Sequence, residues 1–112
     1  MKKFLVLFSA PAETRAKMQS ATPEEMQSAM QPWMDWFAKV GDGMVDKGFP
    51  LRNAMTVTKE GEMPGQVEFV GFTIVQADDM DAAVAIAKMS PHLDRDGATV
   101  EVHEMWAMPG LE

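Results

Sequence analysis

The sequence predicts an α+β domain of the βαββαβ type, with an antiparallel four-stranded sheet. Three observations predict this class. The chain has 112 residues, the size of one ordinary domain. Four strand-like and two helix-like stretches follow one another in the βαββαβ order. Two of the strands, residues 3–8 and 67–76, carry apolar side chains at both parities, as strands covered on both faces do. We therefore expect residues 1–112 to form a single domain.

The first expected strand is residues 3–8. Phe4, Val6 and Phe8 share one face, while Leu5 and Leu7 share the other. This apolar run is too short for a secretory signal, whose apolar region spans roughly 7–15 residues. No run in the chain approaches the roughly 20 apolar residues of a membrane span. We expect no membrane partner.

Residues 12–19 could form one short helical excursion, and the principal helix follows them. Thr22 suits the N-cap of that helix, Pro23 its first position, and Glu25 completes a capping box. One apolar stripe follows at alternating steps of four and three: Met26, Met30, Trp33, Phe37, Val40 and Met44. The stripe keeps its phase across Pro32. We therefore predict one helix, kinked at Pro32 and ended by Gly48-Phe49-Pro50.

The second half of the chain predicts two strands, a helix and a last strand. In order, these are a strand at 54–58, a loop at 59–66, a strand at 67–76, a helix at 80–89 capped by Asp78 or Asp79, a loop at 90–97 and a strand at 98–107. On the last strand, Val100 and Val102 share one face, and Glu101 and His103 share the other.

The order of elements predicts the topology of the sheet. Two right-handed crossovers place strands 1 and 3 at the centre, which gives a ferredoxin-like sheet of order 4-1-3-2. Two helices cover only one face of such a sheet. The other face keeps part of an apolar set: Phe4, Leu5, Val6, Leu7, Val67, Phe69, Val70 and Phe72. A patch of that size is not normally left in water, so we expect a second copy to cover it, giving a homodimer.

Composition excludes several classes of function. The net charge of −7 comes with no basic block, which argues against nucleic-acid binding. The absence of cysteine excludes disulfides and thiolate zinc sites and fits a reducing cytoplasm, where we place the protein. The chain has 12 methionines. They either fill the core or form an adaptable surface, such as a ligand pocket or a dimer face.

Several segments, taken in order, resemble the YCII-related proteins, also called DGPF-domain proteins. They are Lys3-Phe4-Leu5-Val6-Leu7, Thr22-Pro23-Glu24-Glu25, Trp33 and Trp36, Gly48-Phe49-Pro50-Leu51, Gly71-Phe72, Ser90-Pro91-His92-Leu93 and Val100-Glu101-Val102-His103-Glu104. The resemblance covers essentially the whole chain and implies a dimeric α/β barrel. It also implies a cleft with a His–Asp pair, as proposed for some members. The helix-start His and the Asp-Gly-Pro-Phe motif seen in parts of the family are absent.

Two histidines are the candidate acid/base residues. His92 is followed closely by Asp94, and a nearby carboxylate can fix the tautomer of a histidine whose pKa lies near neutrality. The alternative for His92 is a solvated or helix-capping loop residue. His103 lies two residues from Glu101 on one face of the last strand. This pair either lines the dimer barrel or is solvated on an edge strand.

Three further residues are candidates for ligand binding. Arg52 could hold an anion through its planar guanidinium, or form a surface ion pair. Trp36 and Trp106 could line a pocket mouth or the dimer seam, or simply pack. No His or carboxylate spacing predicts a metal site, and no glycine-rich phosphate loop or nucleophile motif predicts a cofactor or a covalent mechanism.

Our leading hypothesis is a homodimer that binds a small molecule, acting as an acid/base enzyme of lyase, isomerase or hydrolase type through His92. The alternative is a non-catalytic ligand-sensing or accessory protein-interaction module. The two differ in the expected cleft. An enzyme needs a histidine and a carboxylate within hydrogen-bond reach, whereas a binding module needs only an apolar cavity.

Overall fold

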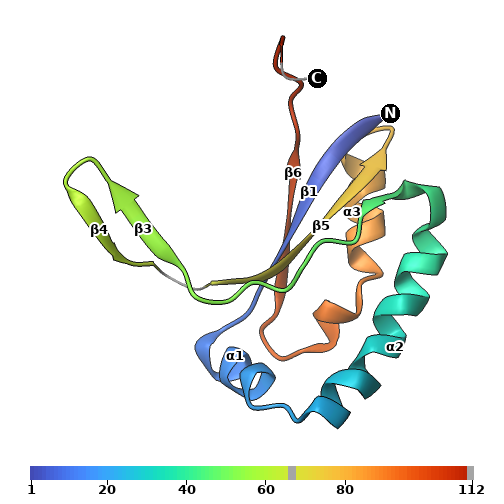
Figure 1. The fold of residues 1–112 in the computed structure, drawn as a ribbon. Helices are drawn as coiled ribbons and strands as arrows, with labels where there is room; N and C mark the ends of the chain where they lie inside the picture. Colours follow the sequence, from blue (N-terminus) through green and yellow to red (C-terminus); the bar gives the residue numbers. More distant parts are fainter. Residues whose placement is uncertain (66–67, 111–112) are drawn as a thin grey trace.

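The computed structural model describes residues 1–65 and 68–110, which form an α+β domain (Figure 1). Its four-stranded antiparallel sheet has the order β2-β5-β1-β6, and a separate two-stranded sheet pairs β3 with β4. The elements in chain order are β1 (Lys2–Ser9), α1 (Ala12–Gln19), α2 (Pro23–Val40), the 3-10 helix η1 (Gly41–Gly43), β2 (Met44–Asp46), β3 (Met55–Thr58), β4 (Gly61–Pro64), β5 (Phe69–Ala77), α3 (Met80–Lys88), the 3-10 helix η2 (Pro91–Asp94) and β6 (Thr99–Glu104).

The centre of the sheet is made by β1 and β5, as predicted. Phe4 pairs with Val75, and both lie in the core with residues of α2 and α3, while Leu5 pairs with Ile74 at the opposite parity and so on the helix-free face. The core lies on the covered face, where alternate residues of both strands are buried: Phe4, Val6, Phe8, Val75 and Ala77, packed with Trp36, Ala83 and Ala87.

The edge strand beside β5 differs from the prediction. Residues 54–58 were expected there, but Met44–Asp46 occupies that edge, with Met44 opposite Val75. The helix ends earlier than predicted because Gly41, with φ of 61°, caps α2 after Val40. The chain then runs along β5 as far as a bridge between Pro50 and Gly71.

Within the predicted strand at 54–58, Met55–Thr58 is a strand, but in a hairpin that stands apart from the main sheet (Figure 1). The predicted loop at 59–66 supplies the second strand of this hairpin, Gly61–Pro64. All eight strand residues of the hairpin are exposed. The predicted positions of Gln66 and Val67 lie outside the described residues.

The start of α2 confirms its predicted capping box. The Thr22 hydroxyl accepts a hydrogen bond from the Glu25 amide (3.1 Å), and the Glu25 carboxylate accepts one from the Thr22 amide (3.2 Å). The helix runs through Pro32 as one element. Asp79 caps α3 through a hydrogen bond from the Ala82 amide. No helix in residues 1–65 and 68–110 combines the length and apolar character needed to cross a membrane.

Most of the methionines lie outside the core, and Met44 packs half-buried against it. None of the 12 is buried, and ten are exposed: Met1, Met26, Met30, Met34, Met55, Met63, Met80, Met89, Met105 and Met108. The predicted stripe of α2 is therefore a core face only towards its end, because the first turns of the helix extend beyond the sheet (Figure 1).

Candidate functional site

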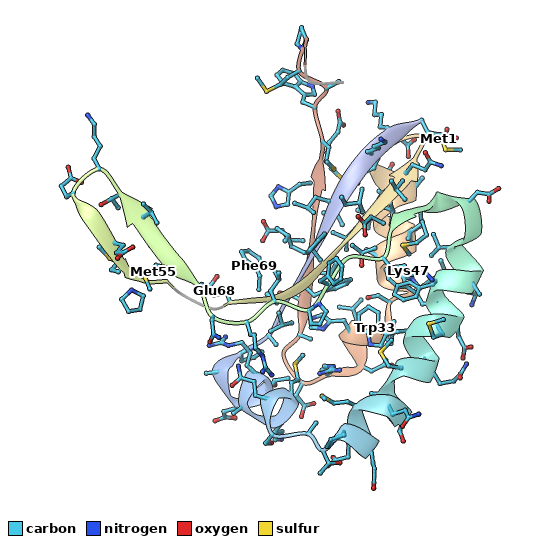
Figure 2. The ribbon with its side chains drawn as sticks, viewed as in Figure 1. Met1, Trp33, Lys47, Met55, Glu68 and Phe69 are labelled. Atoms are coloured by element: carbon cyan, nitrogen blue, oxygen red, sulfur yellow. The ribbon has the colours of Figure 1, made fainter. Side chains whose placement is uncertain are left out.

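A cavity of about 370 Å³ opens between α2, the loop at residues 47–50, β5 and η2. Most of its lining is apolar. The lining residues are Phe8, Met18, Met30, Trp33, Met34, Phe37, Lys47, Gly48, Phe49, Pro50, Val70, Gly71, Phe72, Thr73, His92 and Arg95. Figure 2 shows Trp33 and Lys47 in the region between α2 and the sheet.

The inner wall of the cavity is an aromatic cluster. Phe8 packs edge-on against Trp33, with 5.2 Å between ring centroids, and Trp33 packs edge-on against Trp36 at 5.7 Å. Trp36 is 3% exposed, and its indole Nε1–H donates a hydrogen bond to the Ile86 carbonyl (3.1 Å). Trp36 therefore links α2 to α3 beneath the cavity wall, and Trp33 lines the cavity itself.

His92 is the buried polar residue of the wall. It is 1% exposed, and its Nε2 lies 2.8 Å from the Ser9 carbonyl oxygen. Because a carbonyl only accepts, Nε2 carries the proton of this hydrogen bond. Burial lowers the pKa of His92 below 6.5; Arg95 lowers it further, and hydrogen bonds to the backbone of Ser9 and Thr99 oppose the shift. The ring is neutral at neutral pH.

The loop at residues 47–50 forms the outer wall. The Lys47 carbonyl accepts a hydrogen bond from the Thr73 hydroxyl (3.2 Å), and the Gly48 amide donates to the Asp46 carboxylate (2.8 Å). Gly48 has φ of 73°, and a Cβ there would meet the Phe72 carbonyl oxygen at 1.7 Å. The loop can approach β5 this closely because residue 48 is glycine.

The structure brings two of the six predicted site residues to the cavity region. His92 lines the cavity, and Trp36 lies behind its wall. Asp94 is exposed on η2. Among the described residues, no carboxylate hydrogen-bonds to His92, so the expected His–Asp pair is not formed.

The other three predicted residues lie away from the cavity. His103 Nε2 is 2.6 Å from the Glu101 carboxylate, with both side chains at least half exposed on β6. Arg52 is exposed between β2 and the hairpin. Trp106, beyond β6, is 89% exposed. None of the three lines the cavity.

Sequence reasoning missed the two cations of the lining, Lys47 and Arg95. Arg95 follows His92 by three residues, a spacing that could have singled it out. The sequence predicts a helix that continues to Gly48-Phe49-Pro50, which would put Lys47 on its last turn and not in the cavity wall. Within the described part of the chain, no group of three or more His, Asp or Glu side chains is placed to hold a metal ion.

Comparison of the sequence with protein-family models gave no match, and comparison with curated proteins gave none.

Proposed function

We propose that the protein binds an apolar small molecule in the cavity between α2 and the sheet. The cavity itself is the main support for this proposal. Its volume of about 370 Å³ lies within the range of small-molecule sites, roughly 300–1,000 Å³. Its lining combines rigid rings from β1 and α2 with the flexible side chains of Met18, Met30 and Met34, which adapt to a ligand's shape.

The site chemistry favours binding over catalysis. The neutral ring of His92 is held by the Ser9 carbonyl, and no described carboxylate is placed to accept its proton or orient it. This is the arrangement expected of the non-catalytic alternative.

Fluorescence titration with prodan, a neutral dye that brightens in apolar surroundings, tests the proposal. We expect saturable binding. Met34→Trp should fill the cavity and weaken binding by about tenfold or more, a factor that matches the usual cost of overpacking. Met26 lies on the same helix, is exposed, and does not line the cavity, so Met26→Trp is the matched control. Absence of saturable binding, or equal weakening by both variants, would contradict the proposal.

An acid/base role for His92 is the second candidate, because this residue lies in the cavity wall and its pKa is lowered. Once a converted ligand is found, His92→Gln should abolish turnover while leaving binding in place. His103→Gln is the control, since His103 does not line the cavity. An undiminished rate in His92→Gln would remove the role.

We also propose that a second copy of the chain covers the helix-free face. Leu5, Leu7, Phe72 and Ile74 form a half-buried apolar strip along the two central strands, while Glu101 and His103 lie beside it on β6. A twofold stack of two such faces puts strip against strip and leaves the polar strand at the rim. Such a dimer fits a ferredoxin-like domain related to the YCII proteins.

The exposed hairpin formed by β3 and β4 also favours association with a second copy of the chain. Met55, Val57 and Met63 are exposed on it, and an isolated two-stranded hairpin is marginal in water. Sedimentation velocity tests the dimer: the wild type should be dimeric at micromolar concentration, and Val57→Lys and Leu7→Lys should weaken association. Met89→Lys, on the helix side, is the control. A well-folded wild-type monomer would overturn the dimer and leave the cavity proposal standing.

A further inference from the structure

The charge of the cavity lining is opposite in sign to that of the whole protein. The chain has 10 Lys and Arg against 17 Asp and Glu. The charged residues of the described lining are nevertheless Lys47 and Arg95, with no acidic side chain among them. An acidic protein thus places two cations and no described anion around its apolar cavity.

Lys47 is held in place by its backbone rather than by an acidic partner. The hydrogen bond from Thr73 and the turn at Gly48 fix its main chain, and its Nζ lies 5.5 Å from the centre of the Phe37 ring. Within residues 1–65 and 68–110, no carboxylate forms an ion pair with Lys47. Its ammonium group therefore faces an aromatic wall of the cavity without a neutralising partner.

Arg95 is placed by η2. Its amide donates a hydrogen bond to the His92 carbonyl (3.1 Å), which places it one turn after the buried histidine. Its side chain is half-buried and, among the described residues, has no acidic partner. Its guanidinium is a planar donor suited to two carboxylate oxygens.

We propose that the cavity selects an apolar carboxylate, whose anionic group lies by Lys47 and Arg95 and whose alkyl or aryl body packs on Trp33, Phe37 and the cavity methionines. This inference rests on the proposed function. The apolar walls supply affinity in proportion to the area they cover. The two cations supply the preference for an acid over a neutral molecule of the same shape, because a carboxylate carries the opposite charge and two acceptor oxygens, whereas an alcohol oxygen accepts a hydrogen bond without any charge.

Displacement of prodan by dodecanoate and by dodecanol tests the preference, since the two share their chain and differ in charge. We expect dodecanoate to bind about tenfold more tightly than dodecanol. Lys47→Met and Arg95→Met should each weaken dodecanoate by about threefold to tenfold more than they weaken dodecanol. Lys39→Met and Lys88→Met, which remove exposed charges outside the lining, are the controls and should change neither ligand.

The arms of this experiment separate the two proposals. If prodan binds but the acid and the alcohol displace it equally, or if the lining and control variants weaken the acid equally, the carboxylate preference is wrong and the apolar cavity stands. If prodan binds and neither compound displaces it, the preference is also wrong. If prodan does not bind, the proposed function itself fails. Added salt should weaken the acid and not the alcohol, which gives a second readout of the same charges.

Discussion

The two faces of the main sheet are built from the same strands but differ in their protection from water. On the covered face, Phe4 and Val6 are 0% exposed beneath α2 and α3. On the helix-free face, Leu5 and Leu7 are only half-buried. Alternation along the central strands places apolar side chains on both faces of the sheet, but the helices of this chain cover only one of the two faces. One face of the sheet is therefore a closed hydrophobic core, and the other is an apolar surface that the helices leave uncovered.

The largest expected effect comes from a truncation in the closed hydrophobic core. Phe4→Ala should lower the free energy of unfolding by about 3–5 kcal/mol, because the enclosed site cannot collapse around the lost ring. Leu5→Ala, at the adjacent position on the other face, should lower the free energy of unfolding by clearly less than this in dilute protein. The loss should grow as the protein concentration rises, because the proposed dimer covers Leu5. Urea unfolding at two protein concentrations measures both. If the two variants lost equal free energy of unfolding at low protein concentration, the proposed difference between the two faces would be wrong.

A smaller effect is expected at the joint between the covering helices. Trp36→Phe removes the indole donor of the Ile86 carbonyl, which keeps the Met89 amide, and trims a buried ring, so it should destabilise by about 1–3 kcal/mol. Trp33→Phe, one turn earlier and half-buried, removes no such hydrogen bond and is the matched variant. Chemical denaturation of the two proteins compares them. A Trp33 variant that loses as much as the Trp36 variant would show that packing alone sets the cost.

The start of α2 lies over neither face, so its contribution should be local. Thr22→Ala removes the hydroxyl that accepts from Glu25 and should cost about 1 kcal/mol. Thr22→Ser keeps the acceptor and should retain most of that stability. The thermal midpoints of the two variants test this, and equal midpoints would remove the capping contribution.

The smallest effect is a pH dependence confined to the covered face. The pKa of His92 is lowered from 6.5 by burial, so the unfolded chain takes up a proton at higher pH than the folded protein. The free energy of unfolding should therefore fall as pH decreases from about 6.5 towards the folded pKa, and stay level above it. His92→Gln should flatten this decline, whereas His103→Gln should keep it. Urea midpoints across that range measure the difference.

Much of the fold could be predicted because its signals are local. Apolar side chains on both faces of β1 and β5 predicted that these strands lie at the centre of the sheet. The caps at Thr22 and Asp79 predicted where two helices begin. The edge of the sheet could not be predicted in this way. Residues 44–46 and 54–58 both have strand character, and the choice between them depends on where Gly41 ends α2 and on the close approach at Gly48.

The candidate site was less predictable because a cavity is a property of packing. His92 was found, since histidine draws attention by its chemistry. Trp33 and Trp36 exchanged their expected roles, because the position of α2 over the sheet turns Trp36 inward to reach the Ile86 carbonyl. Lys47 carries no sequence signal of its own. Its place follows from the turn that brings the chain back along β5.

The outward placement of the methionines bears on how the protein meets oxidants. Conversion of a thioether to a sulfoxide adds a polar oxygen and commonly disrupts a core that contains it. Here ten thioethers already face water and none is buried, so among the methionines only the half-buried Met44 would bring the oxidised group against the core. The chemical damage would otherwise be felt at Met30 and Met34, where the mouth of the cavity would become more polar while the fold endures.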